Sequence, residues 1–244
     1  MRKTFLLVLV LVLACATLVG CVNTPEEPVV EEETTSNATV SNPTNSAKSD
    51  ILDISLVESG YSFDEDGNYV YCGFLIKNPN TDWVVDHAQV EITLRDADGG
   101  VISTSSGYTG RILPESIGAG YSFLDTKGEV VASVDFELKK IGEYDVSKAD
   151  TLGTLTADSL QAVGVKESES GFGRISFTGE IENSSSEDIE NATIAIVLRN
   201  AEGNITSVES TYVNDISAGG KRPFEVSTYG TSYASYEIFI SPGI

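Results

Sequence analysis

Residues 92–99 read ITLRDADG and residues 196–203 read IVLRNAEG, so one eight-residue pattern occurs twice in the chain. Each copy lies at the end of a run in which apolar and polar residues alternate. The apolar members of the two runs are Ala88, Val90, Ile92 and Leu94, and then Ala192, Ile194, Ile196 and Leu198. Strict alternation predicts a β-strand with one buried face, and the Asp, Asn and Gly residues that follow are typical of turns. The pattern therefore predicts one strand and one turn that the fold uses twice.

The sequence around the two octapeptides repeats in the same order. VYCGFLIKN at 70–78 corresponds to ISFTGEIEN at 175–183, AGYSF at 119–123 to AGGKRPF at 218–224, and VDFEL at 134–138 to YEIFI at 236–240. Short alternating segments between Gly-, Asp- and Asn-rich turns, without a convincing amphipathic helix, are typical of a β-sandwich. We therefore predict an all-β protein with two tandem immunoglobulin-like β-sandwich domains, at 51–140 and 158–244, joined by a linker at 141–157.

The end of each alternating run resembles the motif of a known family. ITLRD at 92–96 is similar to the F-x-L-Y-D motif of the FxLYD domain, with Ile in place of Phe and Arg in place of Tyr. IVLRN at 196–200 also has Asn in place of the final Asp, and GEIEN at 179–183 is similar to the upstream G-x-[IV]-x-N feature. The resemblance covers most of 51–244. It implies an immunoglobulin-like module of a prokaryotic envelope lipoprotein, in a family that no catalytic site or cofactor defines.

Residues 1–20 have the features of a lipoprotein signal peptide. A basic start precedes an apolar segment, and LVGC at 18–21 resembles the lipobox, in which cleavage before the Cys leaves its thiol to carry a lipid. We predict that Cys21 is the lipidated first residue of the mature chain. VLAC at 12–15 fits the same pattern less well. An uncleaved anchor over 5–22 is the alternative, because that segment just reaches the length of a membrane span.

Residues 21–50 are predicted to form a disordered acidic stalk rich in Ser, Thr and Pro. The segment contains no aromatic residue, so it cannot bury enough apolar surface to offset its ordering entropy. Such a stalk would hold the folded part away from the membrane. Sequons that permit N-glycosylation stand at Asn37, Asn183, Asn191 and Asn204. Chance matches in a Ser/Thr-rich chain are the alternative explanation of these sequons.

The charge balance argues against nucleic acid as a partner. The chain has 15 Lys and Arg residues against 37 Asp and Glu residues, a net charge of −22, whereas phosphate binding needs clustered basic residues. High acidity keeps a protein soluble at elevated salt, and cation binding is the alternative explanation. Together with the lipobox, the acidity suggests an archaeal or other salt-exposed cell surface.

Cysteine and histidine usage limits the chemistry of the folded part. Cys72 is the one thiol beyond the N-terminal segment, so no internal disulfide is expected there, and zinc sites built from several Cys and His ligands are excluded by count. Cys72 lies on the inward parity of its strand and is predicted to be a core residue. His87, on the outward parity, is predicted to be exposed. The acidic turns at 64–68 and 96–100 lack the twelfth-position Glu of a calcium loop, so we expect turns, no metal and no cofactor.

Comparison of the two copies points to candidate ligand-binding residues, because a residue that the fold needs should recur. The single Trp, Trp83, lies on a loop, and the aligned residue of the second copy is Glu187. Exposed Trp is enriched in recognition sites. Covering the end of a sandwich is its alternative role. Tyr229, Tyr233 and Tyr236 lie among Ser and Gly, a composition typical of recognition loops. An ordinary edge strand is the alternative for these tyrosines.

These observations predict a non-enzymatic, lipid-anchored extracellular binding or spacer module of the cell envelope. Its partners would be the membrane, through the lipid on Cys21, and an envelope protein or surface polymer. An accessory subunit of a membrane transporter or surface-layer complex is the second hypothesis, which an apolar patch on one sheet face would favour. A secreted hydrolase that uses carboxylates or His87 is the third, and it requires a cleft with converging titratable groups.

Overall fold

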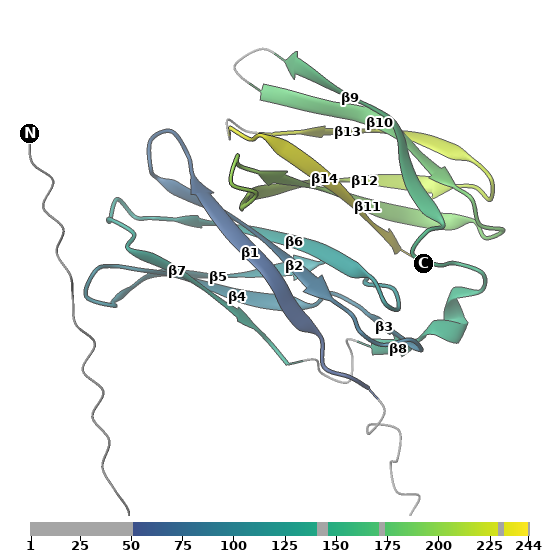
Figure 1. Ribbon diagram of the computed structural model, residues 1–244, viewed down its shortest axis with the longest axis horizontal. Coiled ribbons are helices and arrows are strands. Elements are labelled where there is room, and N and C mark those ends of the chain that lie inside the picture. The colour runs from purple at the N-terminus through teal and green to yellow at the C-terminus, as the bar shows by residue number, and fades with distance from the viewer. Residues whose placement is uncertain (1–50, 141–145, 171–173, 229–231, 244) are drawn as a thin grey trace, which may run out of the picture. The chain divides into compact units, whose positions relative to one another are not determined.

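A computed structural model describes residues 51–140, 146–170, 174–228 and 232–243, and these residues contain strands, turns and one short 3-10 segment (Figure 1). The predicted all-β class is confirmed. The lipidation residue Cys21, the sequon Asn37 and the candidate Tyr229 lie outside the described residues. The described residues belong to one compact unit that extends from Ser46 to Ile244. No helix among them is long and apolar enough to cross a membrane.

The first repeat, which we define as residues 55–138, forms a six-stranded antiparallel sheet with the order β1-β2-β6-β5-β4-β7. The strands of the first repeat, including β3 outside this sheet, are β1 (Ser55–Phe63), β2 (Tyr69–Lys77), β3 (Trp83–Val85), β4 (Gln89–Arg95), β5 (Val101–Thr109), β6 (Ile117–Asp125) and β7 (Ser133–Leu138). The short strand β3 lies outside this sheet and pairs with β8 (Val146–Lys148), which belongs to the predicted linker.

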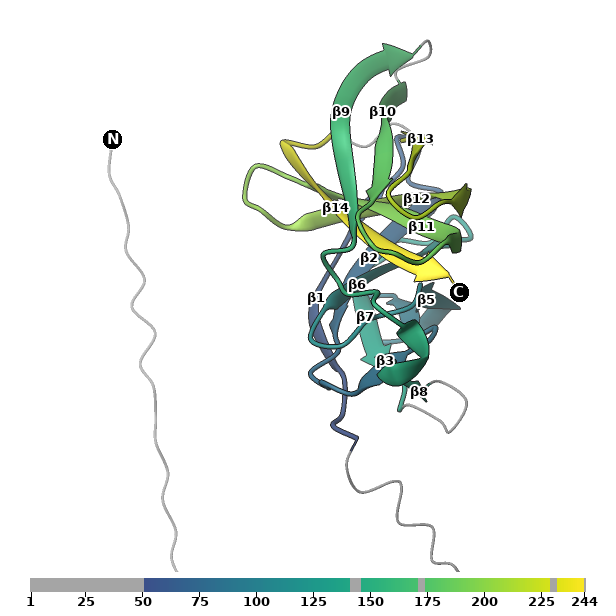
Figure 2. The ribbon, with the colours of Figure 1, turned by 90° about the vertical axis from the view of Figure 1, so that its right-hand side faces the viewer.

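The second repeat, residues 160–243, contains two three-stranded sheets with the orders β13-β10-β9 and β12-β11-β14, so that β9 and β13 flank β10 (Figure 2). Its strands are β9 (Leu160–Ser170), β10 (Arg174–Asn183), β11 (Ile189–Arg199), β12 (Ile205–Ile216), β13 (Lys221–Ser227) and β14 (Ser235–Gly243). The same neighbours occur in the first repeat as β1-β2-β6 and β5-β4-β7. There, the pairs Tyr108–Tyr121 and Thr109–Gly120 join the two halves into one sheet.

The alternating residues of both runs are buried on one face, as predicted. All eight apolar members of the runs before the octapeptides are at most 4% exposed. In the second repeat these side chains pack against Phe177, Ile181 and Phe224 of the facing sheet. In the first repeat they pack against Val70, Cys72, Phe74 and Ile76 of β2, within a separate core cluster.

The octapeptides form the same turn in both repeats, which supports the structural interpretation of the pattern. Oδ1 of Asp96 accepts the backbone N–H groups of Asp98 and Gly100. Oδ1 of Asn200 likewise accepts those of Glu202 and Asn204. Asp and Asn are interchangeable here because either side chain supplies the oxygen of an Asx turn.

A buried asparagine also recurs at the end of β2 and of β10. Nδ2 of Asn78 donates to the carbonyl oxygens of Trp83, Ile112 and Leu113 at 2.8, 3.1 and 3.1 Å. Nδ2 of Asn183 donates to those of Glu187, Ile216 and Ser217 at 2.8, 3.2 and 3.3 Å. Each amide joins carbonyls from two separate connections, so these residues hold the end of each repeat together.

The described part of the predicted linker packs against both repeats. It continues from β8 into the 3-10 segment η1 (Ala149–Leu152), and the buried Leu152 and Leu155 belong to the core cluster of the second repeat. That cluster also includes Val84 and Leu113 of the first repeat. The linker therefore contributes core residues as well as a connection.

Candidate functional site

The outer faces of the two repeats meet in a third apolar cluster. It consists of Leu75 and Ala119 from the first repeat and Ala195, Val197, Ile205 and Val208 from the second. Close approach depends on Gly73, since a Cβ atom there would lie 2.6 Å from Cγ2 of Val208. Sheet faces that pack in this way must be apolar on both sides of the strand. The outer face of β2 meets this requirement, whereas the outer face of its counterpart β10 is polar.

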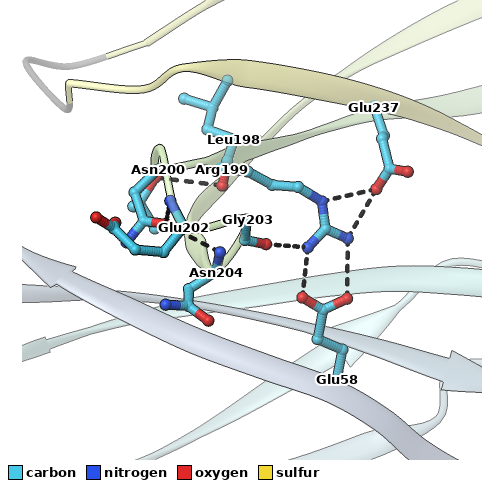
Figure 3. A network of polar contacts seen from close by, with 9 residues as sticks. Glu58, Leu198, Arg199, Asn200, Glu202, Gly203, Asn204 and Glu237 are labelled. Atoms are coloured by element: carbon cyan, nitrogen blue, oxygen red, sulfur yellow. Dashed lines mark hydrogen bonds and ion pairs between the residues drawn. The ribbon is translucent and has the colours of Figure 1, made fainter.

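An ion-pair network closes one edge of this contact (Figure 3). Both terminal nitrogens of Arg199 bond the carboxylate of Glu58, with Nη2 at 2.9 Å from Oε2. Arg199 also bonds Glu237 through Nε at 2.8 Å and the carbonyl oxygen of Gly203 at 2.8 Å. The hydrogen bond to Glu58 is the largest cause of an upward shift in the pKa of Arg199. Burial partly opposes this shift, and the hydrogen bond to Glu237 adds to it.

The equivalent arginine of the first repeat makes only the local part of this network. Nε of Arg95 bonds Asp135 at 2.5 Å, and its Nη1 bonds the carbonyl oxygen of Gly99 at 3.1 Å. These contacts match those of Arg199 with Glu237 and Gly203. The pair with Glu58 is therefore an addition that joins the repeats, while the rest of the pattern belongs to the turn.

Beside the packed contact, the two repeats enclose an inter-repeat cleft of about 860 Å³. The first repeat contributes β5, β6 and the bend at Asp86 and His87, and the second contributes parts of β11, β12 and β14. Tyr108, Tyr121 and Tyr212 line it and are 50%, 43% and 70% exposed. Eight of the 17 other lining residues are Ser, Thr or Asn, so the cleft offers hydroxyl and amide groups from both repeats.

A smaller aromatic groove of about 340 Å³ shares Tyr121, Ser122 and Phe123 with the cleft. Its other lining residues are Tyr69, Tyr71, Cys72, Val208 and Glu209. The rings of Tyr69 and Phe123 lie edge to face, with centroids 6.5 Å apart at 66°. Ser210, next to Glu209 on β12, donates a hydrogen bond to the hydroxyl of Tyr121 at 3.2 Å.

Glu209 is the acidic residue of the aromatic groove. It is half-buried, and burial raises the pKa of its carboxyl group to about 7. Within the described part of the chain, no hydrogen bond or ion pair reaches this carboxylate. The equivalent residue of the first repeat is Ser105, which bonds Ser122 instead. Glu209 is thus a residue that the repeat itself does not require.

Of the residues that the sequence singled out for chemistry, His87 borders the cleft and Cys72 lies in the core. His87 is exposed in a bend with φ 53°, beside the ion pair between Arg111 and Asp86 at 2.6 Å. No hydrogen bond in the described residues links His87 to a serine or a carboxylate. Cys72 is 1% exposed, and burial raises the pKa of its thiol to about 12. The expectation of a core cysteine is confirmed.

Trp83 lies away from the cleft, against the linker. Its half-buried ring has Nζ of Lys148 4.0 Å from the centroid, and the two residues are paired partners in the β3–β8 ladder. Its carbonyl oxygen accepts a hydrogen bond from the buried Asn78. These contacts agree with the covering role that the sequence left open for Trp83.

Tyr233 and Tyr236 pack beside the core of the second repeat. Their ring centroids lie 5.8 and 4.8 Å from that of Phe177, and the hydroxyl of Tyr233 donates to Glu167 at 2.9 Å. Burial, followed by the bond to Glu167, raises the pKa of Tyr233 to about 12. Both tyrosines line a shallow hollow of about 520 Å³, which does not join the inter-repeat cleft.

The three described sequons differ in accessibility. Asn183 is fully buried and its amide nitrogen already donates three hydrogen bonds, so a glycan would have to break them. Asn191 is half-buried and lines the inter-repeat cleft. Asn204 lies exposed beside the octapeptide turn. In the folded chain, Asn204 is the described sequon that fits a glycan with the least rearrangement.

Reasoning from the sequence missed the aromatic groove, although a signal for it exists. Tyr69, Tyr71, Gly73 and Leu75 make the outer face of β2 apolar, and Ala195 and Val197 do the same for β11. The corresponding outer positions of β10 and β4 carry Arg, Ser, Thr and Glu. A strand that is apolar on both faces indicates that both faces are covered.

Among the described residues, no group of three or more His, Cys, Asp and Glu side chains is arranged to hold a metal ion. Comparison with known proteins adds little. No family model and no curated protein matches the chain. A solved structure of red sea bream transglutaminase is similar over 79% of this chain and 29% of its own, at 11% identity and a TM-score of 0.27.

Two structures of Bacteroides uniformis beta-glucuronidase 2 are also similar. One, covalently bound to cyclophellitol-6-carboxylate aziridine, is 14% identical over 66% of this chain and 22% of its own, with a TM-score of 0.21. The other, a calcium binding mutant, is 11% identical over 76% and 24%, with the same TM-score of 0.21. The chain spans less than a third of each of these proteins, and such TM-scores support no inference about activity.

Proposed function

We propose that this protein is a non-enzymatic, lipid-anchored binding module of the cell envelope that faces the outside. In this proposal Cys21 carries the lipid, residues 21–50 form the stalk, and 51–140 and 158–244 are tandem immunoglobulin-like β-sandwich domains related to the FxLYD module. The observation that carries the binding role is the inter-repeat cleft, because exposed tyrosines from both repeats line it.

The recurrence of strand order supports the tandem-sandwich part of the proposal. Each repeat contains two groups of three strands with the same neighbours, and apolar residues lie between the two groups in each. Six strands of this length in about 85–90 residues suit a sandwich of roughly immunoglobulin size. A spacer would need no such cleft, so the cleft favours a binding module over a simple spacer.

Tyrosine-rich clefts suit recognition for a physical reason. A Tyr side chain offers a large, rigid surface and a hydroxyl group at little cost in conformational entropy. Tyr108 and Tyr212 belong to different repeats and line the same cleft. A ligand that touches both would also stabilise the contact between the repeats, since it binds only the assembled form.

The anchoring part of the proposal is tested by the mass and membrane partitioning of the protein from its native host. We expect a chain that starts at Cys21 with a lipid-sized mass increment. Cys21→Ser should lose both the increment and membrane retention, while Cys15→Ser, the matched control, should keep them. A chain that retains residues 1–20 would support an uncleaved anchor, and a free unlipidated chain in the medium would contradict the proposal.

A further inference from the structure

We propose that the aromatic groove binds a small solute that carries a quaternary-ammonium group, held by the rings of Tyr69, Tyr71, Tyr121 and Phe123 beside Glu209. The inference rests on the proposed binding role and names the class of ligand. It concerns the groove between β2, β6 and β12, at the end of the inter-repeat cleft.

The pairing of β2 with β6 places the four rings on one face. In this ladder Tyr71 is opposite Phe123, Gly73 is opposite Tyr121 and Tyr69 is opposite Asp125. Residues that are directly opposite project from the same face of a sheet. Gly73 marks that face as the one that meets Val208 of β12. The rings therefore stand on the covered outer face of the first repeat.

The rings remain accessible although the face around them is covered. Tyr69, Tyr121 and Phe123 are 42%, 43% and 63% exposed, and the groove volume of about 340 Å³ is in the range of small-ligand sites. Rings that meet edge to face present more than one aromatic surface to a guest, as Tyr69 and Phe123 do. Aromatic faces attract cations through their quadrupoles, and quaternary ammonium groups are a common guest of such cages.

The charge of the groove favours a cation over a neutral apolar ligand. Glu209 also lines the groove and has no hydrogen-bonding or ionic partner among the described residues, so above about pH 7, where its carboxyl group is ionised, it adds negative charge beside the rings. A bound cation would offset this desolvation. The net charge of −22 would also raise the local concentration of cations.

The largely apolar surface of the groove favours a quaternary ammonium over a primary amine or a guanidinium. A primary ammonium or a guanidinium exchanges several hydrogen bonds to water for the few acceptors of the groove, and each N–H group left unpaired costs free energy. A quaternary nitrogen has no N–H group and loses none. Its methyl groups can instead contact the rings and Val208.

The second repeat shows that the fold does not require these rings. The positions of Tyr71 and Phe123 correspond to Ser176 and Ser227, which are paired in the β10–β13 ladder and bond each other at 3.0 Å. The position of Tyr121 corresponds to Glu225. At these positions, aromatic residues occur in the first repeat, whose outer face borders β12, and are replaced by polar residues in the second.

The test is calorimetric titration of the full chain, in non-ionic detergent, with choline and with its neutral isostere 3,3-dimethyl-1-butanol. We expect saturable binding of choline and none of the isostere. Phe123→Leu and Glu209→Gln should each weaken choline binding on the order of 10-fold. Tyr61→Leu is the matched control, since Tyr61 is an aromatic residue of similar exposure on β1 outside the groove, and it should bind like the parent chain.

Several results would overturn the inference. The first is equal affinity for choline and the isostere, and the second is no choline binding at millimolar concentration. The third is a loss of choline affinity in Tyr61→Leu as large as that in Phe123→Leu. Binding to phosphatidylcholine vesicles without binding of free choline would show a membrane contact instead of a solute site. Circular dichroism of each variant separates lost binding from lost folding. If choline does not bind, the proposal that Cys21 is lipidated is unaffected. If an unlipidated chain binds choline, the groove proposal holds although the anchor proposal fails.

Discussion

At the scale of single residues, Asn78 and Asn183 are the clearest example of polar groups that the fold itself requires. Both are 0% exposed, and the amide nitrogen of each donates to three carbonyl oxygens from two separate connections. Their recurrence at the same place in two repeats of otherwise different sequence follows from that requirement. A buried carbonyl without a donor costs free energy comparable to a lost hydrogen bond.

We expect Asn78→Ala and Asn183→Ala each to lower the free energy of unfolding by about 2–4 kcal/mol, because each removes the hydrogen bonds of a buried amide that joins two connections. Chemical denaturation followed by circular dichroism measures this change. Asn204→Ala is the control, since this side chain is exposed, and its effect should stay within about 0.5 kcal/mol. Equal effects at all three positions would argue against the role of the two buried Asn residues in holding the end of each repeat together.

Glu209 predicts a pH dependence of stability. Burial raises the pKa of this carboxyl group to about 7 in the folded chain, above its value of 4.5 without that burial. The folded state therefore binds the proton more tightly than the unfolded state. Proton binding by Glu209 therefore contributes to the free energy of unfolding. This contribution is fully present below pH 4.5 and is lost as the pH rises through about 7.

We expect Glu209→Gln to stabilise the protein at pH 8 by on the order of 1–3 kcal/mol and to have little effect at pH 4.5. Urea denaturation of the parent and the variant at both pH values measures the difference. A variant whose stability falls between pH 4.5 and 8 as steeply as that of the parent would show that Glu209 does not cause the dependence.

At the scale of elements, a phenylalanine fills the same place in the core of each repeat, but it comes from a different strand of the pair in each. Phe74 of β2 is paired with Gly120 of β6, and a Cβ atom on Gly120 would lie 2.5 Å from Cζ of Phe74. In the second repeat Gly179 of β10 is paired with Phe224 of β13, and its Cβ would lie 2.9 Å from Cε1 of that ring. One large and one small residue meet in each pair, in exchanged positions. Phe224 therefore corresponds to Gly120 and not to Phe123, which corrects the match of 119–123 with 218–224 that the sequence suggested.

This exchange predicts a coupled pair of substitutions. We expect Phe74→Gly to cost about 3–5 kcal/mol through cavity formation and Gly120→Phe to cost at least about 1–3 kcal/mol through overpacking. The double variant should be more stable than the sum of the two single effects by at least about 1 kcal/mol, because it reproduces the arrangement of the second repeat. Denaturation of all four chains of the cycle gives the coupling. Additive effects would mean that the two positions do not share one space.

At the scale of the whole molecule, the repeats are joined by side chains from three regions. These regions are the outer-face cluster around Leu75 and Val197, the linker residues Leu152 and Leu155, and the Arg199–Glu58 ion pair. Since linker leucines and residues of both repeats share one core cluster, we expect the described part of the chain to unfold in one cooperative transition.

Gly73→Val tests this cooperativity, because a side chain at this position meets Val208 and Ile205 of the second repeat. We expect the variant to force the outer faces apart and to split the single calorimetric transition into two. Thr178→Val is the matched control at the corresponding position of β10, where no such contact between the repeats exists. If Gly73→Val also unfolds in one transition at an unchanged temperature, the outer-face contact does not couple the repeats.

The sequence by itself determined the all-β class, the strands with strict alternation and their buried faces, the octapeptide turns and the repeated order of segments. Each of these depends on local alternation or on the few residues of one turn, so residues 88–99 and 192–203 contain the necessary information. It also indicated the core position of Cys72. The covering role of Trp83 remained an open alternative, because its partner Lys148 lies on a segment without a strong strand pattern.

Only the tertiary structure decided which outer faces meet and where the cleft and the aromatic groove lie. Tyr69 and Glu209 line one groove although they are far apart in the chain, and neither belongs to a motif. The apolar outer faces of β2 and β11 signal that something covers them, but hydrophobic burial is non-directional and does not specify the partner. The partner is selected by close packing at Gly73 and by the bidentate pair of Arg199 with Glu58, which exist only once the two repeats are in contact.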